Sequence, residues 1–151
     1  MDRIEHIINR VINDKNVMTM KRFRQHKNVS TYEHSINVVQ MSLKMAQRFH
    51  LTLRQINNMI IGAMLHDFYL YDYHVTGRIS KNGIHAWSHP KVSLNNALMY
   101  FDLNKNQKNI IRSHMFPTTL FHPPLCKEAF IVCIADKICA FREYFIKGEC
   151  V

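Results

Sequence analysis

The stretch AMLHDFYLYDYH, from Ala63 to His74, places titratable residues in apolar surroundings. His66 and Asp67 stand side by side at the end of an apolar run, and Asp72 follows among tyrosines. A buried carboxylate costs free energy unless it is paired, hydrogen-bonded or bound to a metal ion. The stretch therefore predicts that His66 and Asp67 have partners elsewhere in the chain.

Around this stretch, apolar residues spaced by three and four predict a nearly all-helical chain, because this spacing puts them on one face of a helix. The sequence contains only four glycines and four prolines. Ser30 with Glu33 and Thr52 with Gln55 form the pattern of a capping box at the start of two helices. We expect about six main helices, near residues 2–13, 30–49, 52–66, 88–101, 104–114 and 125–146, the last stopping at Gly148.

The length of 151 residues indicates one domain over 1–151, an all-α helical bundle long enough to bury a core. Its motif-bearing core is expected over about 30–144, with the helix at 2–13 packed on it. Residues 14–29 are predicted to be a basic connector, with room for one short turn. Residues 69–86 contain Gly77 and Gly83 and are predicted to form the main loop, in which short helical turns are possible.

The formal net charge of +9 favours anionic partners, such as phosphates, nucleotides or nucleic acid. It is concentrated in MKRFRQHK, residues 20–27. No run of about 18 apolar residues that could span a membrane is present, and no signal-peptide pattern is visible, so we expect a cytoplasmic protein. The cysteines form no C-x-x-C pair and are interpreted as reduced residues: Cys126, Cys133, Cys139 and Cys150.

Polar residues fall on inward faces or at the ends of the predicted helices, and six of them stand out: His34, His66, Asp67, His89, His114 and Asp136. Each has a structural explanation by itself, as a core histidine, a helix cap or an ion pair. One metal centre would account for all six together, because imidazole and carboxylate suit Mn, Fe, Zn or Ni. Six such ligands are enough for two ions with positions left open for water and substrate.

Other residues near these motifs have two interpretations. His85 is an alternative ligand to His89, but the sequence Ser88-His89-Pro90 favours His89 at a helix start. Asp72 and His74 either line a substrate mouth or belong to a solvated loop. The aromatic residues that could stack on a nucleobase, or pack in the core, are Tyr69, Tyr71, Tyr73, Trp87 and Phe116. The histidines interpreted as surface or packing residues are His6, His26, His50 and His122.

The order of the six candidate ligands resembles the HD superfamily of metal-dependent phosphohydrolases. The pattern H…HD…D is met by His34 in YEHSINVV, His66-Asp67 in GAMLHDF and Asp136 in IVCIADKI. His89 and His114 extend it to H…HD…H…H…D, which is similar to the dinuclear branch that includes YqeK-like and HD-GYP-type proteins. The resemblance covers about residues 30–144.

This resemblance implies one or two divalent transition metal ions as cofactors (Fe, Mn, Zn, Ni or Co). His34, His66, Asp67 and Asp136 would hold one ion, and His89 and His114 would join Asp67, as a bridging carboxylate, around the second. It also implies that a bridging water, activated by the metal ions, attacks the phosphorus of a phosphate ester or anhydride. The substrate would be a small anionic phosphate compound, with a nucleotide as the favoured class.

Leu70 stands where many dinuclear relatives carry the lysine of HDxxK, so positive charge for a phosphate must come from elsewhere. Lys137 and Arg112 are candidates to act with Asp67 and His66 in catalysis. Arg78 and Lys81, with Asp72 and His74, are candidates for substrate binding. The absence of a GYP motif argues against hydrolysis of cyclic dinucleotides.

Two other functional classes stay open. A metal-containing module that binds or senses a nucleotide without turnover would fit the missing lysine. A helical domain that binds RNA or protein through MKRFRQHK would use the His/Asp set for stability only. The sequence does not specify the substrate, the metal or the oligomeric state.

Overall fold

The computed structural model describes residues 2–77, 79–80 and 83–145. Within these residues the chain forms eight α-helices: α1 (Asp2–Ile12), α2 (Lys15–Met18), α3 (Thr31–Ala46), α4 (Leu53–Leu65), α5 (Tyr73–Thr76), α6 (His85–Tyr100), α7 (Lys105–Ser113) and α8 (Lys127–Phe145). A 3-10 helix, η1, covers Thr19–Arg22. The prediction of an all-α fold is confirmed, with the six long helices close to the predicted ranges; Gly148, the predicted stop of the last helix, lies outside the described residues.

Capping boxes fix the starts of three long helices. In each, a cap side chain accepts a hydrogen bond from the third helical amide, and the third residue's side chain accepts one from the cap amide. These reciprocal bonds join Ser30 to Glu33 at α3, Thr52 to Gln55 at α4, and Asn104 to Gln107 at α7. The helix starts are thus encoded locally, which is why the sequence predicts them closely.

Helix α6 begins one turn earlier than predicted, at His85 and not at Ser88. Pro90 consequently lies inside the helix. Proline lacks the N–H that would bond to the carbonyl four residues earlier, so the extra turn costs one intrahelical hydrogen bond. The extra turn places His85 and His89 on one face, with their rings stacked at 4.6 Å.

Two short hairpins lie in segments for which the sequence predicts no strands. In the connector, β1 (Arg24–His26) pairs antiparallel with β2 (Val29–Ser30), after α2 and η1. In the main loop, β3 (Ile79–Ser80) pairs antiparallel with β4 (Gly83–Ile84), after α5. Strands of two or three residues are too short to show the alternation from which strands are recognised.

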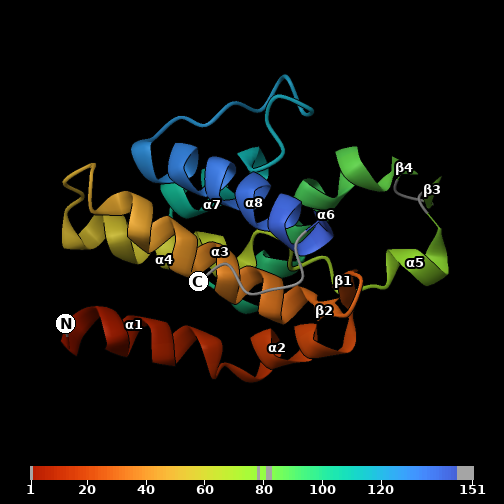
Figure 1. The fold of residues 1–151 in the computed structure, drawn as a ribbon, viewed down its shortest axis with the longest axis horizontal. Coiled ribbons are helices and arrows are strands. Elements are labelled where there is room, and N and C mark those ends of the chain that lie inside the picture. The colour runs from red at the N-terminus through yellow and green to blue at the C-terminus, as the bar shows by residue number, and fades with distance from the viewer. Residues whose placement is uncertain (1, 78, 81–82, 146–151) are drawn as a thin grey trace.

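The long helices pack around a shared core. Helix α3 packs against α4 and α8, and α7 packs against α4, α6 and α8. In Figure 1, α8 lies along one side of α3 and α4 while α1, which contacts α4, lies along the other. Gly62 allows α4 and α7 to approach closely, because a Cβ there would come within 2.6 Å of Ile110 Cγ2.

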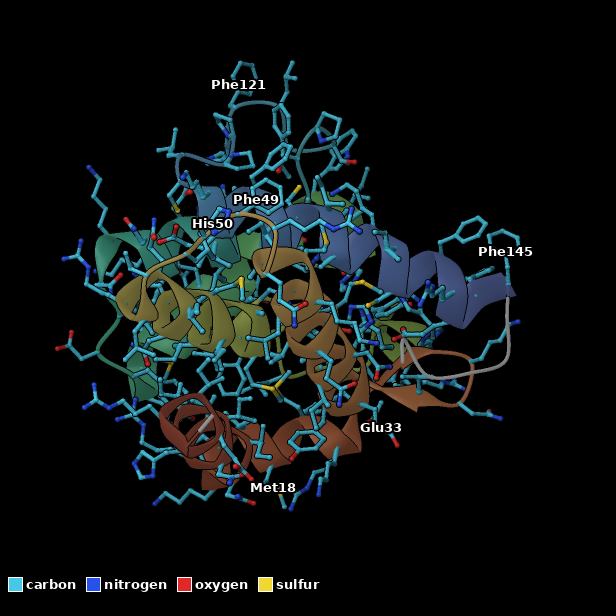
Figure 2. The ribbon with its side chains drawn as sticks, turned by 60° about the vertical axis from the view of Figure 1, so that its left-hand side comes forward. Met18, Glu33, Phe49, His50, Phe121 and Phe145 are labelled. Carbon is cyan, nitrogen blue, oxygen red and sulfur yellow. The ribbon has the colours of Figure 1, made fainter. Side chains whose placement is uncertain are left out.

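The segment between α7 and α8 stands away from this core. Figure 2 shows Phe121 at its outer tip, where the side chain is 90% exposed. In the described part of the chain, no helix has both the length and the apolar character needed to cross a membrane. Cys126 and Cys133 are free thiols, as predicted, Cys139 is buried on α8, and Cys150 lies outside the described residues.

Candidate metal centre

The six polar residues singled out by the sequence meet in the core, although they come from five separate helical segments. They are buried and divide into two groups able to hold an ion: His34, His66, Asp67 and Asp136; and Asp67, His89 and His114. Asp67 belongs to both groups. His34, His89 and Asp136 lie within α3, α6 and α8, while His66 and His114 cap the C-terminal ends of α4 and α7.

In the first group, two histidines face two carboxylates. His34 Nε2 lies 3.0 Å from Asp136 Oδ1 and 3.7 Å from Asp67 Oδ2. His66 Nε2 lies 3.3 Å from Asp67 Oδ2 and 3.5 Å from Asp136 Oδ1. Four donor atoms thus surround one point in the core.

In the second group, two histidines face the other oxygen of Asp67. His89 Nε2 and His114 Nε2 lie 3.2 Å and 3.4 Å from Asp67 Oδ1. The two nitrogens are 2.8 Å apart. Asp67 therefore presents one oxygen to each group, as a bridging carboxylate would.

The other ring nitrogen of each histidine is bonded to an oxygen, which fixes the tautomer. His66, His89 and His114 donate from Nδ1 to the carbonyls of Ala63, His85 and Ile111, at 2.6–2.8 Å. His34 donates from Nδ1 to Glu143 Oε2 at 2.8 Å. When Nδ1 carries the hydrogen, the lone pair of a neutral imidazole is on Nε2, the nitrogen that faces the centre.

This donor set fits divalent transition ions. His66 Nε2 and Asp67 Oδ1 are buried and have no hydrogen-bond partner within the described residues. The lone pairs of His89 Nε2 and His114 Nε2 would face each other at 2.8 Å, which is unfavourable unless an ion or a proton lies between them. Imidazole bonded through its other nitrogen to a carbonyl or carboxylate is the usual form of a metal-ligating histidine.

The electrostatics of the two groups differ. Burial lowers the pKa of His34, but hydrogen bonds to Asp136 and Glu143 outweigh it and raise the pKa to about 9. Burial raises the pKa of the Asp67 carboxyl, but His66 and His114 outweigh it and hold the pKa well below its usual range. In the second group, burial lowers the pKa of His114, and Asp67 offsets only part of this effect. The first group therefore holds a proton at neutral pH that a divalent ion would replace.

A cavity of about 890 Å³ opens onto the centre, so a small substrate could reach it. Asp67, His89, His114 and Asp136 lie in its wall. The described residues around them include aromatic rings at Tyr73, His74 and Tyr144 and lysines at Lys27 and Lys137. The cavity thus combines positive charge with flat apolar surfaces beside the candidate ligands.

Lys137 and His74 are the predicted catalytic or substrate-binding residues that lie in the cavity wall besides the candidate ligands. Lys137 Nζ donates to the His114 carbonyl at 2.9 Å and to the carbonyl and sulfur of Cys133, each at 3.2 Å. His74 Nε2 donates to the Gln25 carbonyl at 3.2 Å. Lys137 is therefore held in place by backbone and contributes fixed positive charge.

Two of the remaining predicted residues, Asp72 and Arg112, lie away from the cavity wall. Asp72 caps α5 by accepting a hydrogen bond from the His74 amide at 2.8 Å, and is not part of the described cavity wall. Arg112 is half-buried on α7, also outside that wall, and burial lowers its pKa. Arg78 and Lys81 lie outside the described residues.

The structure bears on the choice between His85 and His89 and on the position of Leu70. His89 faces Asp67, whereas His85 Nδ1 is hydrogen-bonded to the Tyr71 hydroxyl at 2.7 Å, so the geometry favours His89 as the ligand. Burial, followed by the charge of His89, lowers the pKa of His85 to about 4. Leu70 packs against the hydrophobic core in the left-handed region, at φ 58°, so the position of the missing lysine does not face the cavity.

Four residues that the sequence does not single out lie at the centre or its cavity. Gln25, His26 and Lys27 come from the β1–β2 hairpin and line the cavity, and Glu143 on α8 bonds to His34. His26, interpreted above as a surface or packing residue, is half-buried, with its ring 5.6 Å from that of His34. His26, His34 and Glu143 also lie close enough to form a third ion-binding group. In the sequence, only the basic character of residues 20–27 indicates that this segment has a functional role.

A family model described as the HD domain matches residues 31–140 of the chain. The matched range contains all six candidate ligands and excludes Gln25, Lys27 and Glu143. A comparison with curated proteins gave no match.

Proposed function

The chain belongs to the HD-domain family, and from this premise we propose that it is a metal-dependent phosphohydrolase. We infer that it hydrolyses a phosphate ester or anhydride, with a nucleotide as the favoured substrate class. The observation that carries the proposal is the pair of ligand groups sharing Asp67 at the base of an open cavity. Two ion positions a few ångströms apart are typical of centres that act on phosphate compounds.

Each part of the centre has a role in the proposed reaction. Divalent transition ions, when bound, supply Lewis acidity and lower the pKa of water. Asp67 would hold an ion in each group through its two oxygens, and the histidines, fixed through Nδ1, would offer their Nε2 lone pairs. Because these side chains are buried and hydrogen-bonded, they need little reorganisation during the reaction.

Lys27 and Lys137 supply positive charge that Leu70 cannot. The Lys137 ammonium is held beside His114 by a hydrogen bond, so its positive charge lies close to the second ligand group. Lys27 is exposed at the cavity, with Nζ 5.8 Å from the centre of the Tyr144 ring. An exposed lysine on a long side chain can move to meet a phosphate oxygen.

The aromatic rings of the cavity support a nucleotide substrate, since a nucleobase can stack on flat π-surfaces. Of the aromatic candidates from the sequence, Tyr73 lies in the described cavity wall. Tyr69 is fully buried and Trp87 is 59% exposed. His74 and Tyr144 complete the aromatic surface beside Tyr73.

The position of Leu70 also favours a second candidate function, a nucleotide-binding or sensing module without turnover. The Leu70 side chain packs against the core, and the hydrogens of the Lys137 ammonium are engaged by His114 and Cys133. Such a module would retain the metal centre and the cavity but cleave its ligand slowly or not at all.

A metal-supplemented activity screen of the full chain tests both candidates. Mn²⁺, Fe²⁺, Co²⁺, Ni²⁺ and Zn²⁺ would each be combined with mononucleotides, dinucleoside polyphosphates and simple phosphate esters, with Asp67→Ala as the control. Phosphate release that requires a metal ion and disappears in Asp67→Ala supports the phosphohydrolase. Tight nucleotide binding without product supports the sensing module. RNA binding that falls steeply with salt and survives Asp67→Ala, without metal binding, would overturn both.

A further inference from the structure

Gln25 connects the β1–β2 hairpin to the metal centre, although it lies outside the segment matched by the family model. Its side chain is 7% exposed, while Arg24 beside it on β1 is exposed. Gln25 Nε2 donates a hydrogen bond to Asp67 Oδ2 at 2.7 Å. Gln25 Oε1 accepts a hydrogen bond from the hydroxyl of Tyr69.

The backbone of Gln25 is bonded to the same part of the chain. Its carbonyl accepts hydrogen bonds from the Tyr73 hydroxyl at 2.6 Å and from His74 Nε2 at 3.2 Å. One residue of the hairpin is thus joined to four residues of the segment 67–74, which carries the shared carboxylate. A residue used only for packing would not need both ends of its amide and its carbonyl bonded to one segment.

Asp67 determines which way the Gln25 amide faces, because an ionised carboxylate only accepts hydrogen bonds, and Tyr69 holds the other end of the amide. The two ends of an amide have nearly the same shape, but one donates and the other accepts. Nε2 therefore donates to Asp67, and Oε1 accepts from the Tyr69 hydroxyl. If the amide were reversed, two oxygens would face each other at hydrogen-bond distance, which is unfavourable in a buried site. Tyr69 is 1% exposed, so bulk water cannot replace its hydroxyl.

We propose that Gln25, held by Tyr69, is a positioning residue that sets the rotation of the Asp67 carboxylate. The last torsion of an aspartate side chain is broad, so the backbone alone does not fix where the two oxygens point. The bond from Gln25 holds Oδ2 on the side of His34 and His66, and thereby turns Oδ1 toward His89 and His114. Asp67 Oδ1 accepts no hydrogen bond within the described residues and is left for an ion. The inference rests on the proposed metal centre and adds Gln25 and Tyr69 as the residues that orient its shared carboxylate, Asp67.

Titration of the metal-free full chain with Co²⁺, followed by its absorption spectrum, tests the proposal without any substrate. Gln25→Met removes both amide bonds at similar volume, and Tyr69→Phe removes only the hydroxyl. Since outer partners of metal ligands contribute about 10–100-fold in metal affinity, we expect a loss in this range for Gln25→Met and a smaller loss, with a changed spectrum, for Tyr69→Phe. Arg24→Gln, on the same strand but exposed, is the matched control and should bind Co²⁺ as the unchanged chain does.

A double variant tests whether Tyr69 acts through Gln25. If it does, Gln25→Met with Tyr69→Phe binds Co²⁺ no more weakly than Gln25→Met alone, because the two changes remove one linked pair of bonds. If the losses of Co²⁺ binding free energy in the two single variants add up to the loss in the double variant, Tyr69 does not act through Gln25.

The outcomes separate this inference from the proposed function. Co²⁺ affinity within about twofold of the unchanged chain in Gln25→Met, far below the range for outer partners of ligands, would overturn the inference and leave the centre intact. Failure of the unchanged chain to bind Co²⁺ would overturn the metal centre, and the inference with it. If thermal unfolding shows that Gln25→Met does not fold, Tyr69→Phe is the deciding variant, since it keeps Gln25 and the aromatic ring. An unchanged Co²⁺ affinity and spectrum in Tyr69→Phe would then contradict the proposal.

Discussion

The two ligand groups share Asp67 but differ in the charge around them. His34 in the first group faces Asp136, Glu143 and Asp67, at 3.0, 2.8 and 3.7 Å. His89 and His114 in the second group face Asp67 and each other. Attraction between charges is strong where water is excluded, so the first group has the greater affinity for positive charge. We expect it to bind its ion more tightly than the second group.

This difference follows from the elements that carry the ligands. Helix α8 passes beside α3 and brings Asp136 and Glu143, two turns apart, to opposite nitrogens of His34. The second group is built from α6 and the end of α7, where the nearest partners of the histidines are backbone carbonyls. One centre thus contains a position rich in carboxylates and a position rich in imidazoles.

Removal of Asp67 should have the largest effect, because both groups depend on it. We expect Asp67→Ala to weaken metal binding at both positions by more than the roughly 100-fold upper range for outer partners of ligands, and to abolish hydrolysis. Elemental analysis of metal per chain after dialysis measures this. Asp102→Ala, at an exposed position between α6 and α7, is the matched control. Asp67→Ala that is folded and retains metal at both positions would contradict the shared bridge.

A paired substitution separates the two groups. His34→Gln removes a ligand of the first group, and His89→Gln removes one of the second. If the comparison holds, His89→Gln retains the tightly bound ion, while His34→Gln loses it and binds the remaining ion weakly. Calorimetric titration with Mn²⁺ or Co²⁺ resolves the two binding steps. Equal losses in both variants would show that the ions bind as one unit.

Glu143→Gln is a milder change that concerns the first group alone. The new amide oxygen can still accept from His34 Nδ1, but the negative charge is gone. We expect about tenfold weaker binding of the tighter ion, at the low end for outer partners of ligands, and no change at the second position. Glu5→Gln, exposed on α1, is the control. A larger loss of affinity at the second position than at the first would contradict the assignment of Glu143 to the first group.

The smallest expected effect is on stability in the presence of a chelator. The pKa of His34 is about 9 in the folded chain, against about 6.5 for an unperturbed histidine. A raised pKa contributes stability that is fully present below pH 6.5 and is lost as pH rises through 9. The free energy of unfolding, measured with urea, should therefore have a component that falls between pH 6.5 and 9. His34→Gln should lack this component. If the free energy of unfolding of that variant still falls between pH 6.5 and 9 as in the unchanged chain, the component belongs to other groups.

Binding of an ion should reverse this pH dependence. Because the ion needs the neutral form of His34, its affinity should increase as pH rises from 6.5 to 9, with a proton released on binding. Titration in buffers of different ionisation enthalpy measures that proton. Since His114 has a lowered pKa, binding at the second position should release less. Equal proton release at both positions would contradict the difference in charge between the groups.

The periodicity and capping boxes of the sequence suffice to predict the long helices, because these signals act within a few residues. The six candidate ligands are also visible in the sequence, since a polar side chain on an apolar helix face needs a partner. The extra turn of α6 is not predicted, because Pro90 favours a helix start close to it. The structure brings the six residues together; their binding of metal stays a prediction.

Other features depend on contacts between distant segments. Glu143 is 109 residues from His34, and Gln25 is 42 residues from Asp67. The neighbouring sequence does not identify either residue as part of the centre. A glutamate such as Glu143 is common in helices, and Gln25 lies in a strand too short to show a pattern. The sequence alone therefore indicates which residues need partners, whereas the packing of α8 against α3, and of the β1–β2 hairpin against the segment after α4, determines which partners they find.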